Sequence, residues 1–203
     1  MRLPNTAHAS QPWRIHEITS DFRLEDVWAL PAQGHADDFP QLVGAFTSGI
    51  TRDSPSSLTR TLVAIRSKLG GLLGWDSPDT GLGSRVSTLR ERLPADLRDA
   101  RGPDFENRTF KSLYLLEREF AAEFANQTVH GVLHLGWVAD GTGGYSGRMA
   151  VLVKPHGLFG QAYMAAIRPF RHRVVYPDLM RRIERLWQAG ASGSSARITD
   201  RGN

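Results

Sequence analysis

Cysteine is absent from this 203-residue chain. Its absence excludes disulfides, thiolate nucleophiles and thiolate-held zinc or iron–sulfur centres, so a metal would have to use His, Asp or Glu. Motifs of the GxGxxG, GxSxG and P-loop types are also missing. A dinucleotide, a P-loop nucleotide and a serine acyl-enzyme are therefore not expected. We expect neither a cofactor nor a metal.

Long apolar runs are scarce as well. No stretch approaches the roughly twenty apolar residues that cross a bilayer, and the first residues lack the apolar run of a signal peptide. We therefore expect a cytoplasmic protein without a membrane span. With 40% hydrophobic and 23% charged residues, the chain is predicted to form a single domain over residues 10–190. The small, polar residues 191–203 are predicted to be a disordered tail.

Positive charge is concentrated near the end of the predicted domain. Between Met164 and Gln188 the chain carries two acids and six arginines: Arg168, Arg171, Arg173, Arg181, Arg182 and Arg185. No aromatic side chains interleave these arginines as single-strand binders require, and no nucleic-acid motif is present. We expect a solvated helical face and no nucleic-acid partner. An interaction surface for an acidic partner is the alternative.

In the first half of the chain the pattern is mainly helical. We predict a strand over Trp13–Ile18, a short amphipathic helix over Phe22–Leu30 stopped by Pro31, and a second short helix after Asp37-Asp38. A clearer helix follows over Ser57–Leu69, and a glycine-rich loop over residues 70–85. Leu89, Leu93 and Leu97 suggest short helical turns interrupted by Pro94.

In the second half alternating apolar residues predict an antiparallel sheet. The strands are expected near residues 112–116, 119–125, 128–138 and 146–154, with a glycine-rich turn at 140–144. Helices are expected over Leu158–Arg168 and Asp178–Gln188, separated by Pro169 and Pro177. This order favours an α+β helix-grip fold, in which a curved antiparallel sheet wraps around a C-terminal helix, with helical insertions in the first half.

Several segments also resemble a bacterial domain-of-unknown-function family, family 2867, which is grouped with the START-like (SRPBCC) superfamily. The resemblance extends from about Trp13 to Trp187 and is carried by Phe22–Pro31, Asn126–His130, His134–Trp137, Met149–Pro155, Gly157–Gly160, and Tyr163 through Pro169 to His172. It implies a helix grip with an apolar cavity between sheet and helix. Because the family has no settled activity, the resemblance supplies no catalytic residues.

One group of acidic and histidine side chains has the composition of a catalytic site. Residues 119–138 are predicted to form a hairpin that turns at Asn126-Gln127 and pairs Ala125 with Thr128. Cross-strand neighbours on one face are then two acid–imidazole pairs: Glu123 with His130, and Glu119 with His134. A carboxylate can orient an imidazole and raise its pKa, as a general base requires. These four residues are therefore the candidate catalytic residues.

Other interpretations of this ribbon remain. The pairs lie about 13 Å apart along the strand, which is too far for them to share a metal. On the convex face of a helix grip they would form a solvated ladder, unless another segment or a second subunit covers them; a homodimer therefore remains open. A helix over residues 117–126 would destroy the pairing.

The opposite face of the ribbon is apolar and is expected to face the helix. Candidate ligand-binding residues are Phe120, Phe124, Leu133, Leu135 and Trp137 on the ribbon, and Phe159, Tyr163 and Ile167 on the helical element. The leading hypothesis is a binding module for a small hydrophobic or aromatic molecule in an internal cavity. The alternative is a cofactor-independent enzyme of the cyclase, dehydratase or hydrolase type that uses a His–Glu pair in that cavity.

Overall fold

The computed structural model describes residues 1–49, 82, 86–106, 110–126 and 128–199. The helix expected over residues 57–69 and most of the loop expected over 70–85 lie outside these residues. Within them the fold is α+β, built on one six-stranded antiparallel sheet with the strand order β1-β2-β6-β5-β4-β3. The strands are β1 (Arg2–Leu3), β2 (Arg23–Gly34), β3 (Lys111–Leu115), β4 (Glu119–Ala125), β5 (Val129–Ala139) and β6 (Tyr145–Pro155).

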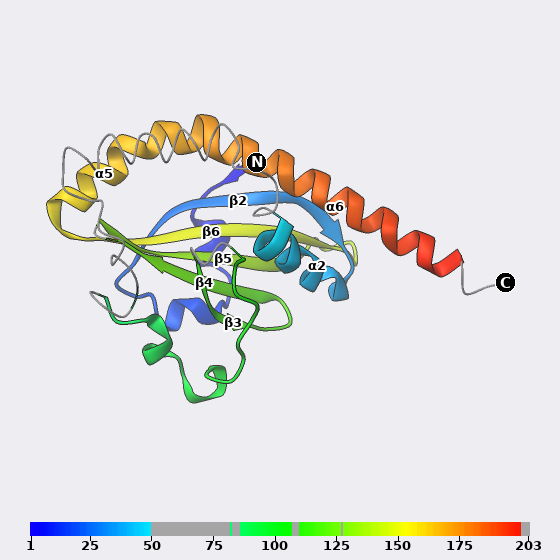
Figure 1. Ribbon diagram of the computed structural model, residues 1–203, viewed down its shortest axis with the longest axis horizontal. Coiled ribbons are helices and arrows are strands. Elements are labelled where there is room, and N and C mark those ends of the chain that lie inside the picture. The colour runs from blue at the N-terminus through cyan, green and yellow to red at the C-terminus, as the bar shows by residue number, and fades with distance from the viewer. Residues whose placement is uncertain (50–81, 83–85, 107–109, 127, 200–203) are drawn as a thin grey trace.

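Helices lie along one face of this sheet and make the structure a helix grip (Figure 1). A nearly continuous helical element follows β6, and a shorter one follows β2. The elements are η2 (Ala36–Asp38), α2 (Phe39–Gly44), the π-helical η3 (Ala45–Gly49), α5 (Gly157–Phe170), the π-helical η6 (Arg171–Val175) and α6 (Tyr176–Thr199). The core on this face joins Tyr176 and Ile183 of α6 to Trp28 of β2 and Trp137 of β5. The predicted helix-grip architecture is thus confirmed.

The opposite face of the sheet is also covered. Four short elements cover it, in two groups separated along the chain: α1 (Thr6–Ala9), the 3₁₀ turn η1 (Arg14–Glu17), and the 3₁₀ turns η4 (Leu89–Arg92) and η5 (Ala95–Leu97). A second apolar core forms here, in which Ile15, Leu89 and Leu93 pack against Val132 and Ala150 of the sheet. Strands β4, β5 and β6 are therefore buried on both faces, which explains why their side chains include few exposed residues.

The first strand of the prediction is wrong. Residues 14–17 form the 3₁₀ turn η1, and no strand forms over Trp13–Ile18. The spacing of Ile15 and Ile18 is three, which places both on one side of a 3₁₀ turn. Both side chains are buried against the sheet. The alternation of side chains over residues 13–18 predicted a strand, whereas the buried residues follow the spacing of a 3₁₀ turn.

The predicted helix over Phe22–Leu30 is also wrong, since β2 occupies Arg23–Gly34. Asp26, Trp28 and Leu30 are buried under the helices, while Val27 packs into the opposite core. Pro31 does not end the strand. On one side, the pairing of β2 with β6 is irregular at Pro31. On the other side, Pro31 lies beyond the two residues of β2 that pair with β1. The missing backbone N–H of Pro31 therefore breaks no hydrogen bond between strands.

The later helical predictions hold with one correction. Helical turns form at Leu89–Arg92 and Ala95–Leu97, and a short helix follows Asp37-Asp38, as expected. Pro169 and Pro177, however, do not separate the last helices, since helical backbone continues from Gly157 to Thr199. The π-helical η6 begins two residues after Pro169, whose nitrogen cannot donate a helical hydrogen bond. The mobility of residues 191–203 stays a prediction.

None of the helices among the described residues combines the length and apolarity needed to cross a bilayer.

Candidate functional site

The β4–β5 hairpin forms, but its register differs from the predicted one by two residues. Ala125 pairs with His130 and not with Thr128. The Asn126 side-chain oxygen accepts hydrogen bonds from the amides of Thr128 and Val129, at 2.8 and 2.9 Å, which builds a longer turn than the predicted two-residue one. Because side chains alternate with a period of two, a shift of two residues leaves every side chain on its predicted face.

Both acid–imidazole pairs therefore form, now between diagonal neighbours. His130 Nε2 lies 2.8 Å from a carboxylate oxygen of Glu123, and His134 Nε2 lies 3.0 Å from one of Glu119. All four side chains are buried, with at most 5% exposed. The solvated ladder is thus wrong, because η1 and η4 cover this face. Strand β4 also excludes the helix considered over residues 117–126.

Glu119 ties the N-terminal segment to the sheet. Its carboxylate accepts hydrogen bonds from the amides of Arg14 and Ile15, both at 2.9 Å, and from the Tyr114 hydroxyl at 2.5 Å. The two amides open η1, so the carboxylate caps this turn from a distant strand. Burial alone would raise the pKa of Glu119, but the bonds from His134, Tyr114 and the Arg14 amide lower it to about 2.

Three histidines extend outward from Glu119 in a chain of hydrogen bonds. His134 Nδ1 lies 3.1 Å from His8 Nε2, and His8 Nδ1 lies 3.2 Å from His16 Nε2. A carboxylate only accepts, so His134 carries a proton on Nε2; in its neutral form it then accepts through Nδ1, and His8 and His16 are oriented in the same way. Burial, and then the neighbouring histidines, lower the pKa of His8 to about 3. His8 is therefore neutral at neutral pH.

Glu123, four residues further along β4, repeats part of this arrangement. It accepts hydrogen bonds from the Thr88 hydroxyl and from the Leu89 amide, so it caps η4 as Glu119 caps η1. The Phe22 ring closes over His130, edge on, with ring centroids 5.1 Å apart. This pair has no histidine chain leading away from it among the described residues. Both predicted pairs thus anchor the segments that cover the sheet.

A third acid–imidazole pair, which the sequence analysis did not identify, lies on the helix face. Asp26 is fully buried and accepts hydrogen bonds from His172 Nε2 at 2.6 Å and from the Tyr176 hydroxyl at 2.9 Å. A guanidinium nitrogen of Arg171 lies 3.3 Å from the same carboxylate. Burial, then the charge of Asp26, raise the pKa of Tyr176. The His172 side chain is 21% exposed, so this imidazole reaches the surface.

Two backbone irregularities meet at this pair. The register of β2 against β6 shifts between Leu24 and Asp26, which indicates a β-bulge at Glu25. Arg171 contacts both Glu25 and Asp26, so the bulge brings two consecutive acids toward the helical element. On the other side, Arg171 and His172 belong to the π-helical η6. Bulges of both kinds are frequent beside functional sites, where they reorient side chains.

Two buried donors near Asp26 lack a partner. Trp28 Nε1 and Arg171 Nε make no hydrogen bond with a described residue, although each is enclosed. The Trp28 ring contacts those of Tyr176 and His172, with centroids 4.8 and 6.3 Å away. Because unsatisfied buried donors cost free energy, these two nitrogens mark a place that a ligand oxygen or water could occupy.

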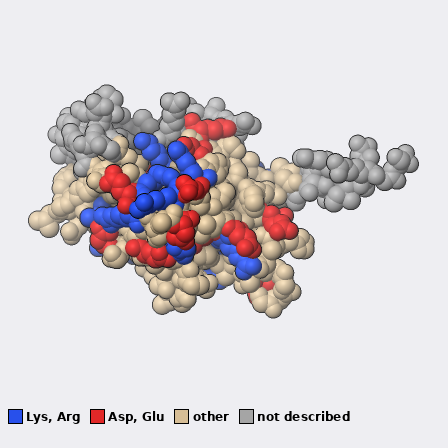
Figure 2. Space-filling view, turned by 90° about the horizontal axis from the view of Figure 1, so that it is seen from below, with Lys and Arg blue, Asp and Glu red and all other residues tan. Residues whose placement is uncertain are grey.

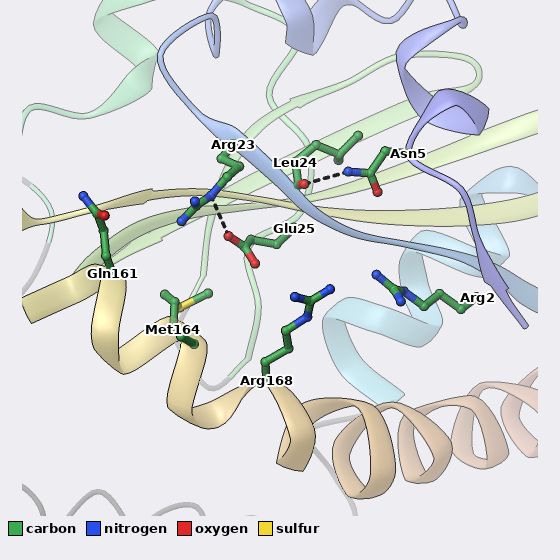
Figure 3. A pocket seen from close by; sticks show the side chains of 9 residues that line it. Arg2, Asn5, Arg23, Leu24, Glu25, Gln161, Met164 and Arg168 are labelled. Atoms are coloured by element: carbon green, nitrogen blue, oxygen red, sulfur yellow. Dashed lines mark hydrogen bonds and ion pairs between the residues drawn. The ribbon is translucent and has the colours of Figure 1, made fainter. Parts of the chain in front are cut away.

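A pocket of about 390 Å³ adjoins this centre between the first two strands and α5 (Figure 3). Arg168 lies one helical turn before His172, and Arg2 pairs with Trp28 in the sheet. Arg23 is paired with Glu25 at 2.9 Å, whereas Arg168 forms no ion pair with a described residue. The lining is Arg2, Asn5, Arg23, Leu24, Glu25, Gln161, Met164, Ala165 and Arg168.

The predicted ligand-binding residues are divided between two clusters. Phe120, Leu133, Leu135 and Trp137 belong to the core under α6 and α2. Phe124, Tyr163 and Ile167 instead pack together near the start of α5, around Val129, Val153 and Met164. Phe159 is 49% exposed. Met164 belongs to the second cluster and also lines the pocket, so α5 connects the predicted wall to the pocket that the sequence did not reveal.

The arginines of the C-terminal element have different environments. Arg168 lines the pocket, Arg171 is nearly buried against Asp26, and Arg181 and Arg182 pair with Asp178. On the face seen in Figure 2, basic side chains gather near the middle with acidic ones beside them. The segments that cover the sheet contain ion pairs between basic and acidic side chains, for example Arg14 with Asp96. No group of three His, Asp or Glu among the described residues is placed to hold a metal ion.

Comparison with known proteins places the chain in a family. Neither the curated proteins nor the solved structures gave a match. The family model described as "Protein of unknown function (DUF2867)" matches residues 18–178. This region contains Asp26, Arg168, His172 and Tyr176, whereas His8 and His16 precede it. Since the match covers most of the sequence, the chain belongs to the DUF2867 family.

Proposed function

We propose that this chain is a START-like protein that binds a small molecule between β2 and α5, and that the ligand joins an acid group to an apolar or aromatic body. The observation that carries the proposal is the pocket of about 390 Å³ with Arg168 at its wall. Pockets for small ligands have volumes of about 300–1,000 Å³. This volume is at the lower end of that range, which suits a molecule of one ring with a short side chain.

The charge of the pocket favours an acid. Three arginines line it against one carboxylate, Glu25, which is already paired with Arg23 and Arg171. Arg168 therefore has its donors available, and a guanidinium binds a carboxylate through two parallel hydrogen bonds. Leu24, Met164 and Ala165 supply an apolar wall for the rest of the ligand. The basic residues thus select the acid group, and the apolar wall selects the body.

Titration with benzoate tests this proposal, with benzyl alcohol as the uncharged comparison. We expect benzoate to bind, benzyl alcohol to bind at least about tenfold more weakly, and Arg168→Ala to weaken benzoate by a similar factor, since one good ionic contact is worth about 1.4 kcal/mol or more. Arg185→Ala, on the same helical element but exposed and away from the pocket, should leave binding unchanged. Equal binding of acid and alcohol, or an unaffected Arg168→Ala variant, contradicts the proposal.

An enzyme of the cyclase, dehydratase or hydrolase type is the second candidate. The 2.8 Å contact between His130 and Glu123 favours it, because it is the arrangement of a base and its orienting acid. His134 is less suited, since both of its ring nitrogens are bonded within the protein. In this candidate, His130→Gln abolishes turnover in a substrate screen and leaves benzoate binding intact. Full turnover by His130→Gln rules it out.

A further inference from the structure

We propose that His172 is a general base for the ligand bound in the pocket, with Asp26 as its positioning residue, and that the substrate is an acid bearing a carbonyl group. This inference rests on the proposed function, because the acid group must be held at Arg168. It assigns a reaction, proton removal from the carbon beside that carbonyl, to a pair of residues that lies outside the predicted Glu–His pairs.

The hydrogen bonds of Asp26 define which nitrogen of His172 is reactive. A carboxylate accepts only, so the 2.6 Å contact requires a proton on Nε2 and leaves the lone pair of neutral His172 on Nδ1. Nδ1 makes no hydrogen bond with a described residue. Asp26 is held in turn by Tyr176 and Arg171. A buried, fixed carboxylate behind a partly exposed imidazole is the arrangement of a base and its orienting group.

The backbone places this imidazole beside the pocket. Arg168 and His172 are four residues apart on one continuous helical element, so about one turn separates them, with the start of the π-helical η6 in between. Arg2 lines the pocket, pairs with Trp28 in the sheet and has its Nε 3.8 Å from Asp26. The bulge at Glu25 and the π-helical η6 both bring their residues to this point. His172 itself does not line the pocket, so we place the carbonyl end of an acid held at Arg168 on the side of Arg2 and Glu25, toward Asp26 and His172.

The two unpartnered donors, Trp28 Nε1 and Arg171 Nε, could stabilise the negative charge that proton removal creates. When Nδ1 takes the proton, the C–H electron pair becomes the C=C bond of an enolate, and the carbonyl π pair moves onto its oxygen. That oxygen gains charge and requires donors. Trp28 Nε1–H and Arg171 Nε–H are buried donors without partners and belong to side chains that contact His172 or Asp26. Return of the proton from Nδ1 to carbon restores the ketone.

Phenylpyruvate in D₂O tests the inference, because it combines a carboxylate, a ketone and one aromatic ring. Calorimetry measures binding, and NMR measures the exchange of its C3 hydrogens. We expect wild-type protein to accelerate exchange over buffer and His172→Gln to lower the rate about 100-fold or more, the usual contribution of a general base. Phenylpyruvate binding should persist in His172→Gln. His156→Gln, near the other end of α5, is the matched control and should exchange at the wild-type rate.

Two further variants separate the roles. Imidazole added to His172→Ala should restore part of the exchange, which a purely structural residue would not allow. Asp26→Asn should lower the rate at saturating phenylpyruvate, alter its pH profile and change KM little, whereas Arg168→Ala should mainly raise KM. Circular dichroism confirms that each variant is folded.

The outcomes distinguish the two proposals. Phenylpyruvate that binds without faster exchange, or exchange unchanged in His172→Gln, overturns the base and leaves the binding function standing. A wild-type protein that binds benzoate but not phenylpyruvate overturns this inference alone, and one that binds neither compound overturns both proposals.

Discussion

Two buried carboxylate–imidazole pairs, Glu119–His134 and Asp26–His172, lie on opposite faces of the same sheet. In each, a histidine Nε2 donates to a carboxylate that also accepts from a tyrosine hydroxyl. They differ at the other ring nitrogen. His134 Nδ1 is bonded to His8 and the side chain is 1% exposed, whereas His172 is 21% exposed and its Nδ1 makes no hydrogen bond with a described residue. Chemical identity alone therefore does not distinguish a structural pair from a reactive one.

The difference lies in what each pair connects. Glu119 binds backbone amides of a segment more than 100 residues earlier, so its pair fastens one layer of the fold to another. Asp26 binds side chains, and its histidine keeps one nitrogen for another partner. We therefore expect substitutions at the first pair to change stability and substitutions at the second to change chemistry.

The largest effect is expected for Glu119→Gln. Three donors besides His134 point at this carboxylate, and a carboxamide cannot accept from all of them. Leaving several buried donors without their charged acceptor costs about 3 kcal/mol or more. Urea denaturation should show this loss, while Glu117→Gln, whose side chain is 78% exposed, should unfold like wild type. A loss below about 1 kcal/mol would remove the distinction between the pairs.

A pH dependence is expected from the histidine chain. The pKa of His8 is about 6.5 in the unfolded chain and about 3 in the folded protein, so between these values the unfolded state binds the extra proton. Stability is then present above pH 6.5 and is lost as the pH falls. One proton gives a slope approaching about 1.4 kcal/mol per pH unit. The lowered pKa of His16 acts in the same direction.

Unfolding measured between pH 6.5 and 4.5 isolates this contribution, since the lowered pKa of Glu119 acts only below its ordinary value of 4.5. His8→Gln should flatten the slope there, and Ser10→Ala, on an exposed neighbour, should not. A wild-type stability that is constant over this window would contradict the neutral histidine chain.

The smallest change in stability is expected for His172→Gln. The new amide can still donate to Asp26, which keeps its bond from Tyr176 and its contact with Arg171. A loss of about 1 kcal/mol or less follows, because one hydrogen bond at a partly exposed site is replaced and not removed. Thermal unfolding monitored by circular dichroism measures it. A loss as large as that of Glu119→Gln would show that both pairs are structural.

The sequence predicted the sheet well because side-chain alternation is a local property. It placed Glu119, Glu123, His130 and His134 on one face, and this survived a register error of two residues caused by the Asn126 side chain. It failed at β2, where Leu24, Val27, Trp28 and Leu30 also fit helical spacing. That strand is defined by pairing with β6, more than 100 residues away, which no local pattern contains.

Long-range contacts also explain what the sequence missed at the site. Asp26 and His172 are 146 residues apart, and the bulge and π-helix that bring them together have no sequence motif. Both do lie in segments that carry the family resemblance, Phe22–Pro31 and Pro169–His172, which was the available indication. The burial of the histidine face was missed because its covering turns, such as η1, are too short to show periodicity.

The pairing of β2 also constrains how the chain is made. Among the described residues, β2 pairs with the two residues of β1 and otherwise with β6, where Arg23 pairs with Val153. During synthesis, β2 therefore leaves the ribosome more than 100 residues before β6, the strand with which it pairs. Strands β4, β5 and β6 are joined by short turns and can pair first. Until β6 is made, β2 remains unpaired, with apolar side chains on both of its faces. We expect closure of so long a loop to be slow, and until it closes the unpaired edge and apolar side chains of β2 favour aggregation.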